Sequence, residues 1–166
     1  LLTTLIDCVF PPTQNNLLLR NTQSNNEDLF RPHTFLQTAA LSHYSNPVIK
    51  AAITENKFTN HGGARKLLTE IVNIWLNNQT DSVIFIPIPL SKGRAKERGY
   101  NQVTEILKPL QTTLDTKILT RSLETPPQSE LTKEKRLQNI KGCFSCNIQR
   151  LQTLPPCRII LVDDVI

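Results

Sequence analysis

The sequence predicts an α/β fold with a parallel sheet, and two apolar strands on either side of a predicted helix are the observations behind this prediction. Residues 82–90 form an apolar run whose two prolines lie in its carboxyl-terminal half, where they leave a strand ladder intact. A helix is expected from about Gln102 to Leu107. The apolar run from Ile159 to Val162 predicts a further strand, buried on both faces. Strands that alternate with helices are typical of a parallel sheet flanked by helices.

Composition narrows the class of protein. A chain of 166 residues is long enough for one domain with a proper core. The balance of 19 Lys and Arg against 14 Asp and Glu favours partners that carry phosphate. An aromatic content of 5% argues against a platform that stacks nucleic-acid bases. The sequence therefore favours a phosphate-bearing ligand without choosing among nucleotides, sugar phosphates and nucleic acid.

The cysteines and the amino-terminal segment bear on compartment and metal content. The four cysteines are scattered, so a reducing cytoplasm is expected and a disulfide scaffold is not. Cys143 and Cys146 have the spacing of half a zinc site but lack a second pair, so no zinc is expected. The apolar segment before Pro11 is interrupted by Asp7 and is too short to cross a bilayer. No membrane insertion is expected.

Two regions are predicted along the chain. Residues 1–43 are expected to form an amino-terminal segment and linker, in which Leu17-Leu18-Leu19 packs as a strand. Residues 44–166 are expected to form the core domain. Within it, helices are predicted from about Val48 to Asn56, opened by an Asn-Pro pair, and from about Ala64 to Leu76. Both helices have apolar residues at amphipathic spacing.

An acidic pair, Asp163 and Asp164, follows the last predicted strand. Because buried carboxylates are costly, the pair is expected where this strand leaves the sheet at its carboxyl end. Ligands of open α/β sheets bind at that edge. Two acids there can accept hydrogen bonds from a sugar diol or help to hold a divalent cation. A plain strand end with solvated acids is the alternative that the pattern leaves open.

A basic loop is predicted from Ser91 to Tyr100, directly after the strand at 82–90. Gly93 and Gly99 permit a close approach of the backbone to a ligand. Positive charge together with backbone N–H groups suits an anion such as pyrophosphate. A solvated basic turn is the alternative. The cations of this segment are Lys92, Arg94, Lys96 and Arg98.

A polar segment precedes the last strand and carries a second group of cations. Lys133, Lys135 and Arg136 lie within residues 128–139. They are suited to a lid that closes over a charged substrate and excludes water. An exposed amphipathic helical turn with ordinary ion pairs fits the same residues, and periodicity does not decide between the two.

Taken together, these motifs resemble the ComF family of phosphoribosyltransferase-like proteins. The resemblance is strongest over residues 82–166 and looser from Tyr44 to Leu68. The acidic pair after an apolar strand is common to type I phosphoribosyltransferases generally, whereas the other blocks indicate ComF. The motifs are Ile86-Pro-Ile-Pro-Leu90, Arg98-Gly-Tyr-Asn-Gln102, Gln128-Ser-x-Leu-Thr-x-x-x-Arg136-x-x-Asn139 and Ile160-Leu-Val-Asp-Asp164.

The resemblance implies a type I phosphoribosyltransferase-like parallel sheet that binds phosphoribosyl pyrophosphate (PRPP) with Mg²⁺. It also implies an enzyme that transfers the phosphoribosyl group of PRPP to an acceptor. It implies that Asp163 and Asp164 contact the ribose hydroxyls, with Mg²⁺ near them. The family is associated with competence, the uptake of DNA, so a single-stranded DNA-binding accessory protein that transfers nothing is the alternative. The implied pyrophosphate loop is Ser91, Lys92, Gly93 and Arg94, and the family motif and lid residues are Arg98, Gly99, Asn101, Gln102, Gln128, Arg136 and Asn139.

Two departures from the family pattern matter. Phe10-Pro11-Pro12 is not followed by the cysteines of the zinc ribbon that family members often carry there, so zinc binding is not implied. The family pattern continues after the acidic pair into a Thr/Gly-rich loop that holds the 5-phosphate, and this sequence ends at Ile166. The sequence therefore predicts a fold that is incomplete at its carboxyl end, and it indicates neither the acceptor nor the oligomeric state.

Overall fold

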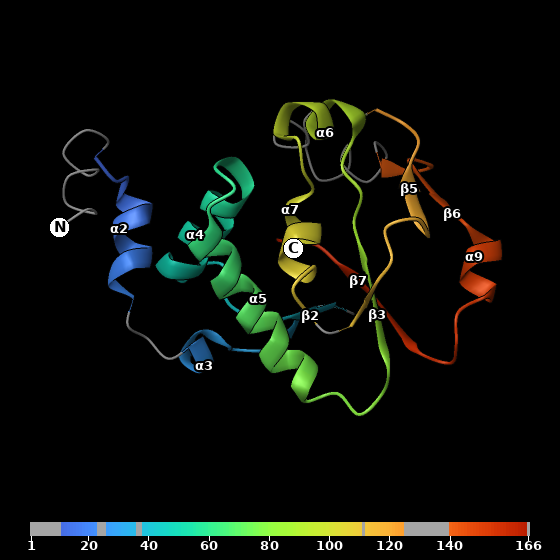
Figure 1. Cartoon of the computed structure of the whole chain (residues 1–166), viewed down its shortest axis with the longest axis horizontal. Helices are drawn as coiled ribbons and strands as arrows, with labels where there is room; N and C mark the ends of the chain where they lie inside the picture. Colours follow the sequence, from blue (N-terminus) through green and yellow to red (C-terminus); the bar gives the residue numbers. More distant parts are fainter. Residues whose placement is uncertain (1–10, 23–25, 36–37, 111, 125–139, 166) are drawn as a thin grey trace. The chain divides into compact units, whose positions relative to one another are not determined.

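A computed structural model describes residues 11–22, 26–35, 38–110, 112–124 and 140–165 of the chain (Figure 1). Its contacts divide the chain into two compact units. The first is Leu1–Asn78 with Val165–Ile166, and the second is Gln79–Asp164. The predicted boundary after residue 43 falls inside the first unit, and as a domain boundary it stays a prediction.

The first unit is mainly helical. Its elements are α2 (Gln14–Asn21), α3 (Asn26–Leu29), the antiparallel strands β1 (His33–Phe35) and β2 (Thr38–Ala40), α4 (Pro47–Phe58) and α5 (Gly62–Asn77). The predicted strand at Leu17–Leu19 is wrong, because these residues lie within α2. The helix begins at a side-chain cap, in which the Thr13 hydroxyl accepts a hydrogen bond from the Asn16 N–H at 3.2 Å. A run of three leucines fits either structure, and the cap favours the helix.

The two predicted helices of this unit are confirmed as α4 and α5. Asn46 Oδ1 accepts hydrogen bonds from the N–H groups of Val48 and Ile49, at 2.9 and 3.3 Å, and a proline occupies the first helical turn. α5 begins two residues before the predicted start, since His61 Nδ1 accepts a hydrogen bond from the Ala64 N–H at 3.1 Å and thereby caps the helix.

The second unit contains a parallel three-stranded sheet, which confirms the α/β class. Its strands are β3 (Val83–Pro87), β4 (Thr113–Leu114) and β7 (Arg158–Val162), in the spatial order β4-β3-β7. Both neighbours of β3 run parallel to it. The helices α6 (Lys92–Arg98) and α7 (Gln102–Leu107) connect β3 to β4. Between β4 and β7 lie an antiparallel pair, β5 (Leu119–Arg121) with β6 (Phe144–Cys146), and α9 (Ile148–Gln152).

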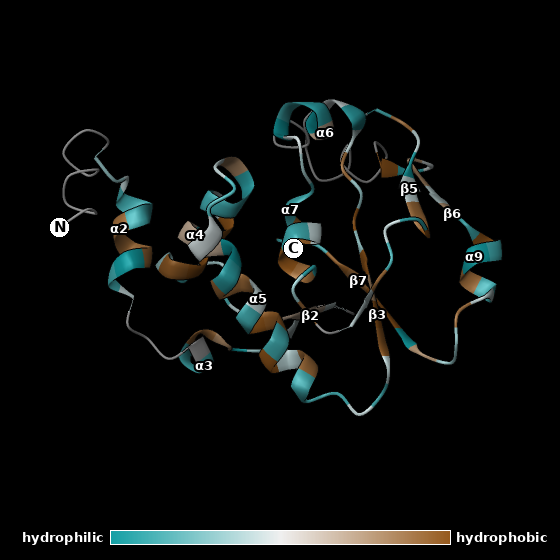
Figure 2. Cartoon of the chain, in the orientation of Figure 1, coloured by the Kyte–Doolittle hydropathy of each residue, from teal (hydrophilic) through white to brown (hydrophobic). Residues whose placement is uncertain are grey.

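β3 is the central strand and the centre of this unit's core. All five of its residues are buried, and Phe85 is 1% exposed. Buried Val103 and Leu107 come from α7, which contacts β3. Ile84 and Ile86 form a buried cluster with Ile118, against which the partly buried residues Leu119, Leu151, Leu154 and Cys157 pack. Figure 2 shows β3 and β7 as predominantly apolar strands.

The prediction that the last strand is buried on both faces is wrong. β7 pairs with β3, and in the described part of the chain no second strand pairs with it. Ile159 and Leu161 are 40% and 61% exposed, whereas Ile160 and Val162 are partly buried. Four consecutive apolar residues predict a strand but do not show which face is covered, because the covering side chains come from other parts of the chain.

Asp115, which is not among the predicted site residues, anchors the turn that follows β4. Its N–H donates to the Phe85 carbonyl at 2.9 Å, and its Oδ1 accepts from the Lys117 and Ile118 N–H groups at 2.8 and 3.0 Å. Its Oδ2 accepts from Arg150 Nε at 2.6 Å. Burial acts to raise the pKa of Asp115, but the two N–H groups and the guanidinium outweigh burial and lower this pKa.

We expect Asp115→Asn to lower the free energy of unfolding at pH 7 by about 1–3 kcal/mol, because a buried acceptor loses its charge-assisted partners. A lowered pKa in the folded state contributes stability above the unfolded-state pKa of about 3.9, and this contribution is lost as the pH falls through the folded-state value. The difference between variant and wild type should therefore shrink between about pH 5 and about pH 2. Urea unfolding at several pH values measures it.

The control is Asp81→Asn, which changes an exposed acid of the same unit. It should alter stability by less than about 0.5 kcal/mol at any of these pH values. An Asp115→Asn loss that is the same at both ends of this pH range would contradict the role assigned to the ionised carboxylate.

Candidate functional site

The carboxyl ends of β3 and β7 lie side by side. Pro87 is in register with Val162, the last residue of β7, and the Ile88 N–H donates to the Val162 carbonyl at 2.9 Å. The segment after β3 and the acidic pair after β7 therefore leave the sheet at one edge. Along the chain these strands follow one another as β3, β4 and β7, but in the sheet β3 lies between β4 and β7. In open α/β sheets with this strand order, ligands bind in the crevice between the first and third strands, which are β3 and β7 here.

The basic segment after β3 is a helix, so the predicted loop is wrong. Ser91 caps α6, its Oγ accepting a hydrogen bond from the Arg94 N–H at 3.3 Å. Gly99 ends the helix in the left-handed conformation, with φ of 79°. A serine cap, helix-forming residues and a terminal glycine are the usual signals of a short helix. The cationic residues Lys92, Arg94 and Lys96 are exposed on it.

A carboxylate of the chain itself faces the start of α6. Glu124 accepts hydrogen bonds from the N–H groups of Lys92 and Gly93, at 2.5 and 3.4 Å. These are two of the backbone groups that are predicted to face pyrophosphate. Glu124 was not identified from the sequence, since it lies 31 and 32 residues from its partners. The assignment of Ser91, Lys92, Gly93 and Arg94 to a pyrophosphate loop stays a prediction.

Asn101 organises the turn between α6 and α7. Its Oδ1 caps α7, accepting from the N–H groups of Val103 and Thr104 at 2.9 and 3.2 Å. Its Nδ2 donates to the Ile88 carbonyl at 2.9 Å. One side chain therefore fixes both the start of α7 and the path of the chain as it leaves β3.

Gln102 joins the basic helix to the acidic pair. It is 4% exposed, and its Nε2 donates to Asp164 Oδ2 at 3.1 Å. Its Oε1 accepts a hydrogen bond from Arg98 Nη1. Asp163 is exposed, and its Oδ1 accepts from the Asp164 N–H at 2.9 Å. The structure thus brings Arg98, Gln102 and Asp164 together at the carboxyl edge of the sheet.

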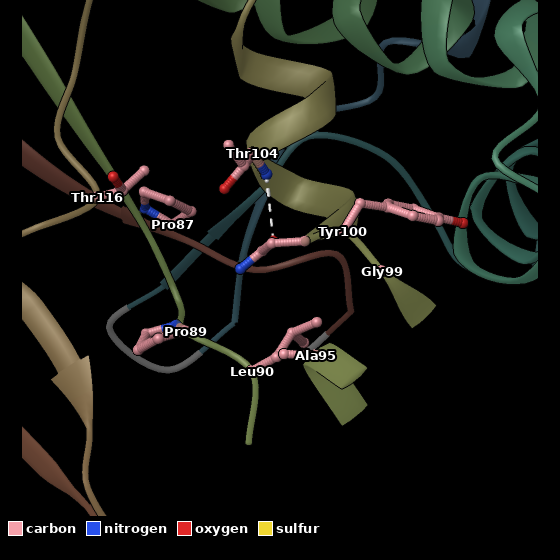
Figure 3. Close-up of a pocket in the computed structure, with 9 residues that line it drawn as sticks. Pro87, Pro89, Leu90, Ala95, Gly99, Tyr100, Thr104 and Thr116 are labelled. Carbon is pink, nitrogen blue, oxygen red and sulfur yellow. Dashed lines mark hydrogen bonds between the residues drawn. The ribbon is translucent and has the colours of Figure 1, made fainter. Parts of the chain in front are cut away.

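A cavity of about 230 Å³ lies beside this edge, between the β3 exit and the turn that joins α6 to α7 (Figure 3). Its walls include Pro87, Pro89 and Leu90, and among the described residues no charged side chain lines it. In Figure 3 the Tyr100 ring is directed away from the two prolines. An uncharged cavity of this kind does not suit a phosphate group, so the charged residues along the edge are the better candidates.

The described residues do not form a metal cage from protein ligands alone. They contain no group of three His, Cys, Asp or Glu side chains placed to hold an ion. Cys143 is a buried free thiol, Cys146 is exposed and Cys157 is partly buried. A divalent cation at Asp163 and Asp164 would thus take further oxygen ligands from water or a bound molecule, and the expectation that zinc is absent stays a prediction.

Three predicted site residues, Gln128, Arg136 and Asn139, lie outside the described residues, as does the whole predicted lid. The other predicted residues of the family motif are described. They lie together where α6 ends and α7 begins: Arg98 and Gly99 end α6, and Asn101 and Gln102 begin α7.

One comparison with known proteins bears on the family. Competence protein F of Haemophilus influenzae (strain ATCC 51907 / DSM 11121 / KW20 / Rd) is 38% identical to this chain over 85 residues. The match covers 49% of this chain and 37% of that protein.

This likeness supports the resemblance to the ComF family.

The matched part spans little more than a third of the Haemophilus protein. Neither a family model nor a solved structure matches the chain. Every helix in the described ranges is too short or too polar to cross a bilayer.

We expect Gly99→Ala to lower the free energy of unfolding by about 1–2 kcal/mol, because an L-residue is strained at a φ of 79°. Gly62→Ala is the matched control, since a Cβ at Gly62, in the first turn of α5, meets nothing within 4 Å. It should be neutral or slightly stabilising. Urea unfolding of both variants checks this, and equal losses would contradict the assigned backbone conformation.

Proposed function

We propose that this chain carries the PRPP-binding core of a phosphoribosyltransferase-like protein of the ComF family, which transfers the phosphoribosyl group to an acceptor. One observation supports the proposal above the others. At the carboxyl edge of the parallel sheet, the acidic pair after β7 is linked through Gln102 to Arg98 at the end of the basic helix. A site with acids for a sugar and cations for phosphates fits PRPP chemically.

The roles of the residues follow from their charges. The carboxylates of Asp163 and Asp164 would accept hydrogen bonds from the ribose hydroxyls. The cationic side chains of α6 would face the pyrophosphate, with Lys92 and Arg94 at its first turn. Glu124 holds the adjacent N–H groups, so pyrophosphate would either displace this carboxylate or bind through the side chains alone.

The donor set at the acidic pair fits Mg²⁺. This ion prefers oxygen ligands and is commonly held by one or two carboxylates together with substrate phosphates. Asp163 and Asp164 would supply the carboxylates and PRPP the remaining oxygens. When bound, the ion would neutralise part of the negative charge of the pyrophosphate.

The reaction would require positioning and charge stabilisation rather than a protein nucleophile. The bond between ribose C1 and the pyrophosphate oxygen breaks, the sugar acquires oxocarbenium character, and the acceptor forms the new bond at C1. The residues of this chain would hold the ribose in place and stabilise the charge that develops on the leaving pyrophosphate.

Isothermal titration calorimetry of the complete gene product with PRPP and Mg²⁺ tests the proposal. We expect binding that weakens about 10- to 100-fold in Asp163→Asn and Asp164→Asn, because each loses a charged acceptor. Asp81→Asn, at an exposed acid outside the site, serves as the control and should bind as the wild type does. Absence of heat at millimolar PRPP, or equal affinity in all four proteins, would contradict the proposal.

Single-stranded DNA binding is the second candidate, favoured by the name of the Haemophilus relative and by the exposed cations of α6. For this function we expect binding to a labelled oligonucleotide that weakens steeply with salt, and Arg94→Ala should reduce the salt slope by about one. Lys141→Ala, at an exposed cation beyond α6, is the control. Oligonucleotide binding that is insensitive to salt, or unchanged in Arg94→Ala, would exclude a DNA contact at α6.

A further inference from the structure

We infer that Gln102 is a positioning residue that orients the carboxylate of Asp164 toward the bound sugar, and that Arg98 in turn fixes the Gln102 amide. This inference rests on the proposed function. It assigns to two residues of the Arg98–Gln102 motif a role that neither sequence nor charge alone indicates.

The chemistry of the three groups fixes the orientation of the amide. A guanidinium only donates hydrogen bonds, and an ionised carboxylate only accepts them. The glutamine must therefore present Oε1 to Arg98 and Nε2 to Asp164, as the structure has it. A flipped amide would lose both hydrogen bonds at once, so each partner reinforces the other.

The surrounding backbone holds this arrangement in place. Arg98 is the last residue of α6 and Gln102 the first of α7, and the turn between them is fixed by the left-handed Gly99 and the Asn101 cap. Gln102 is 4% exposed, which restricts its rotamers. The donor to Asp164 is therefore preorganised before any ligand binds, as an effective site requires.

The test compares two ligands in the complete gene product. PRPP contains the ribose that Asp164 would contact, whereas inorganic pyrophosphate lacks it. Gln102→Met keeps the size of the side chain and removes both hydrogen bonds. We expect its affinity for PRPP with Mg²⁺ to fall about 10- to 100-fold, as is usual for a residue that orients a ligand-binding group. Its affinity for pyrophosphate measured without Mg²⁺, to which Asp164 would contribute no ligand, should change far less.

Two further variants separate positioning from folding. Gln102→Glu keeps the acceptor for Arg98 but sets a second carboxylate against Asp164, so its loss of PRPP affinity should exceed that of Gln102→Met. In an Asp164→Asn background, Gln102→Met should cause no further loss. Gln149→Met, at an exposed glutamine of α9, is the matched control and should bind both ligands normally.

The outcomes are distinguishable. Equal losses for PRPP and pyrophosphate in Gln102→Met would indicate a merely structural role and overturn this inference alone, as would a full additional loss in the Asp164→Asn background. If Gln102→Met does not fold, Gln102→Glu gives the same comparison of ligands. A wild-type protein that binds neither ligand would overturn the proposed function and this inference with it.

Discussion

The parallel pairing of β3 with β7 is the constraint on which the candidate site depends. Five residue pairs are in register, from Val83 with Arg158 to Pro87 with Val162. This pairing brings two segments from opposite ends of the second unit's sequence to a common edge of the sheet. Backbone hydrogen bonds and burial of β3 fix this register, because a slip by one residue would turn every side chain of a strand to the other face. The segments that follow these two strands, α6 and the acidic pair, then supply the charged groups of the site.

The features that could be predicted from the sequence are those with local causes. The helices that begin after Asn46 and Asn101 were predicted because a capping side chain and the N–H groups it satisfies lie within three residues of each other. The strand at β3 and the emergence of the acidic pair at the end of β7 result from uninterrupted apolar runs. That the separate motifs belong to one site was predicted only from the resemblance to the ComF family. The match to the Haemophilus protein supports this resemblance.

The features that were missed have two different causes. For α6 the signals were present, since Ser91 and Gly99 are a cap and a terminator, but a high density of cations and two glycines favoured a loop in the interpretation. The exposure of β7, the ion pair of Asp115 with Arg150 and the contacts of Glu124 depend on residues far along the chain. A single sequence contains no local pattern for such contacts, so they were beyond prediction.

The link from Arg98 through Gln102 to Asp164 makes the two ends of the candidate site one structural unit, with the cations on α6 and the acids after β7. A crystal structure of the complete gene product with PRPP and Mg²⁺ would examine this unit directly. We expect the ribose hydroxyls on Asp163 and Asp164 and the pyrophosphate toward α6. A ligand bound elsewhere, or an Asp164 that no longer contacts Gln102, would contradict the proposed site.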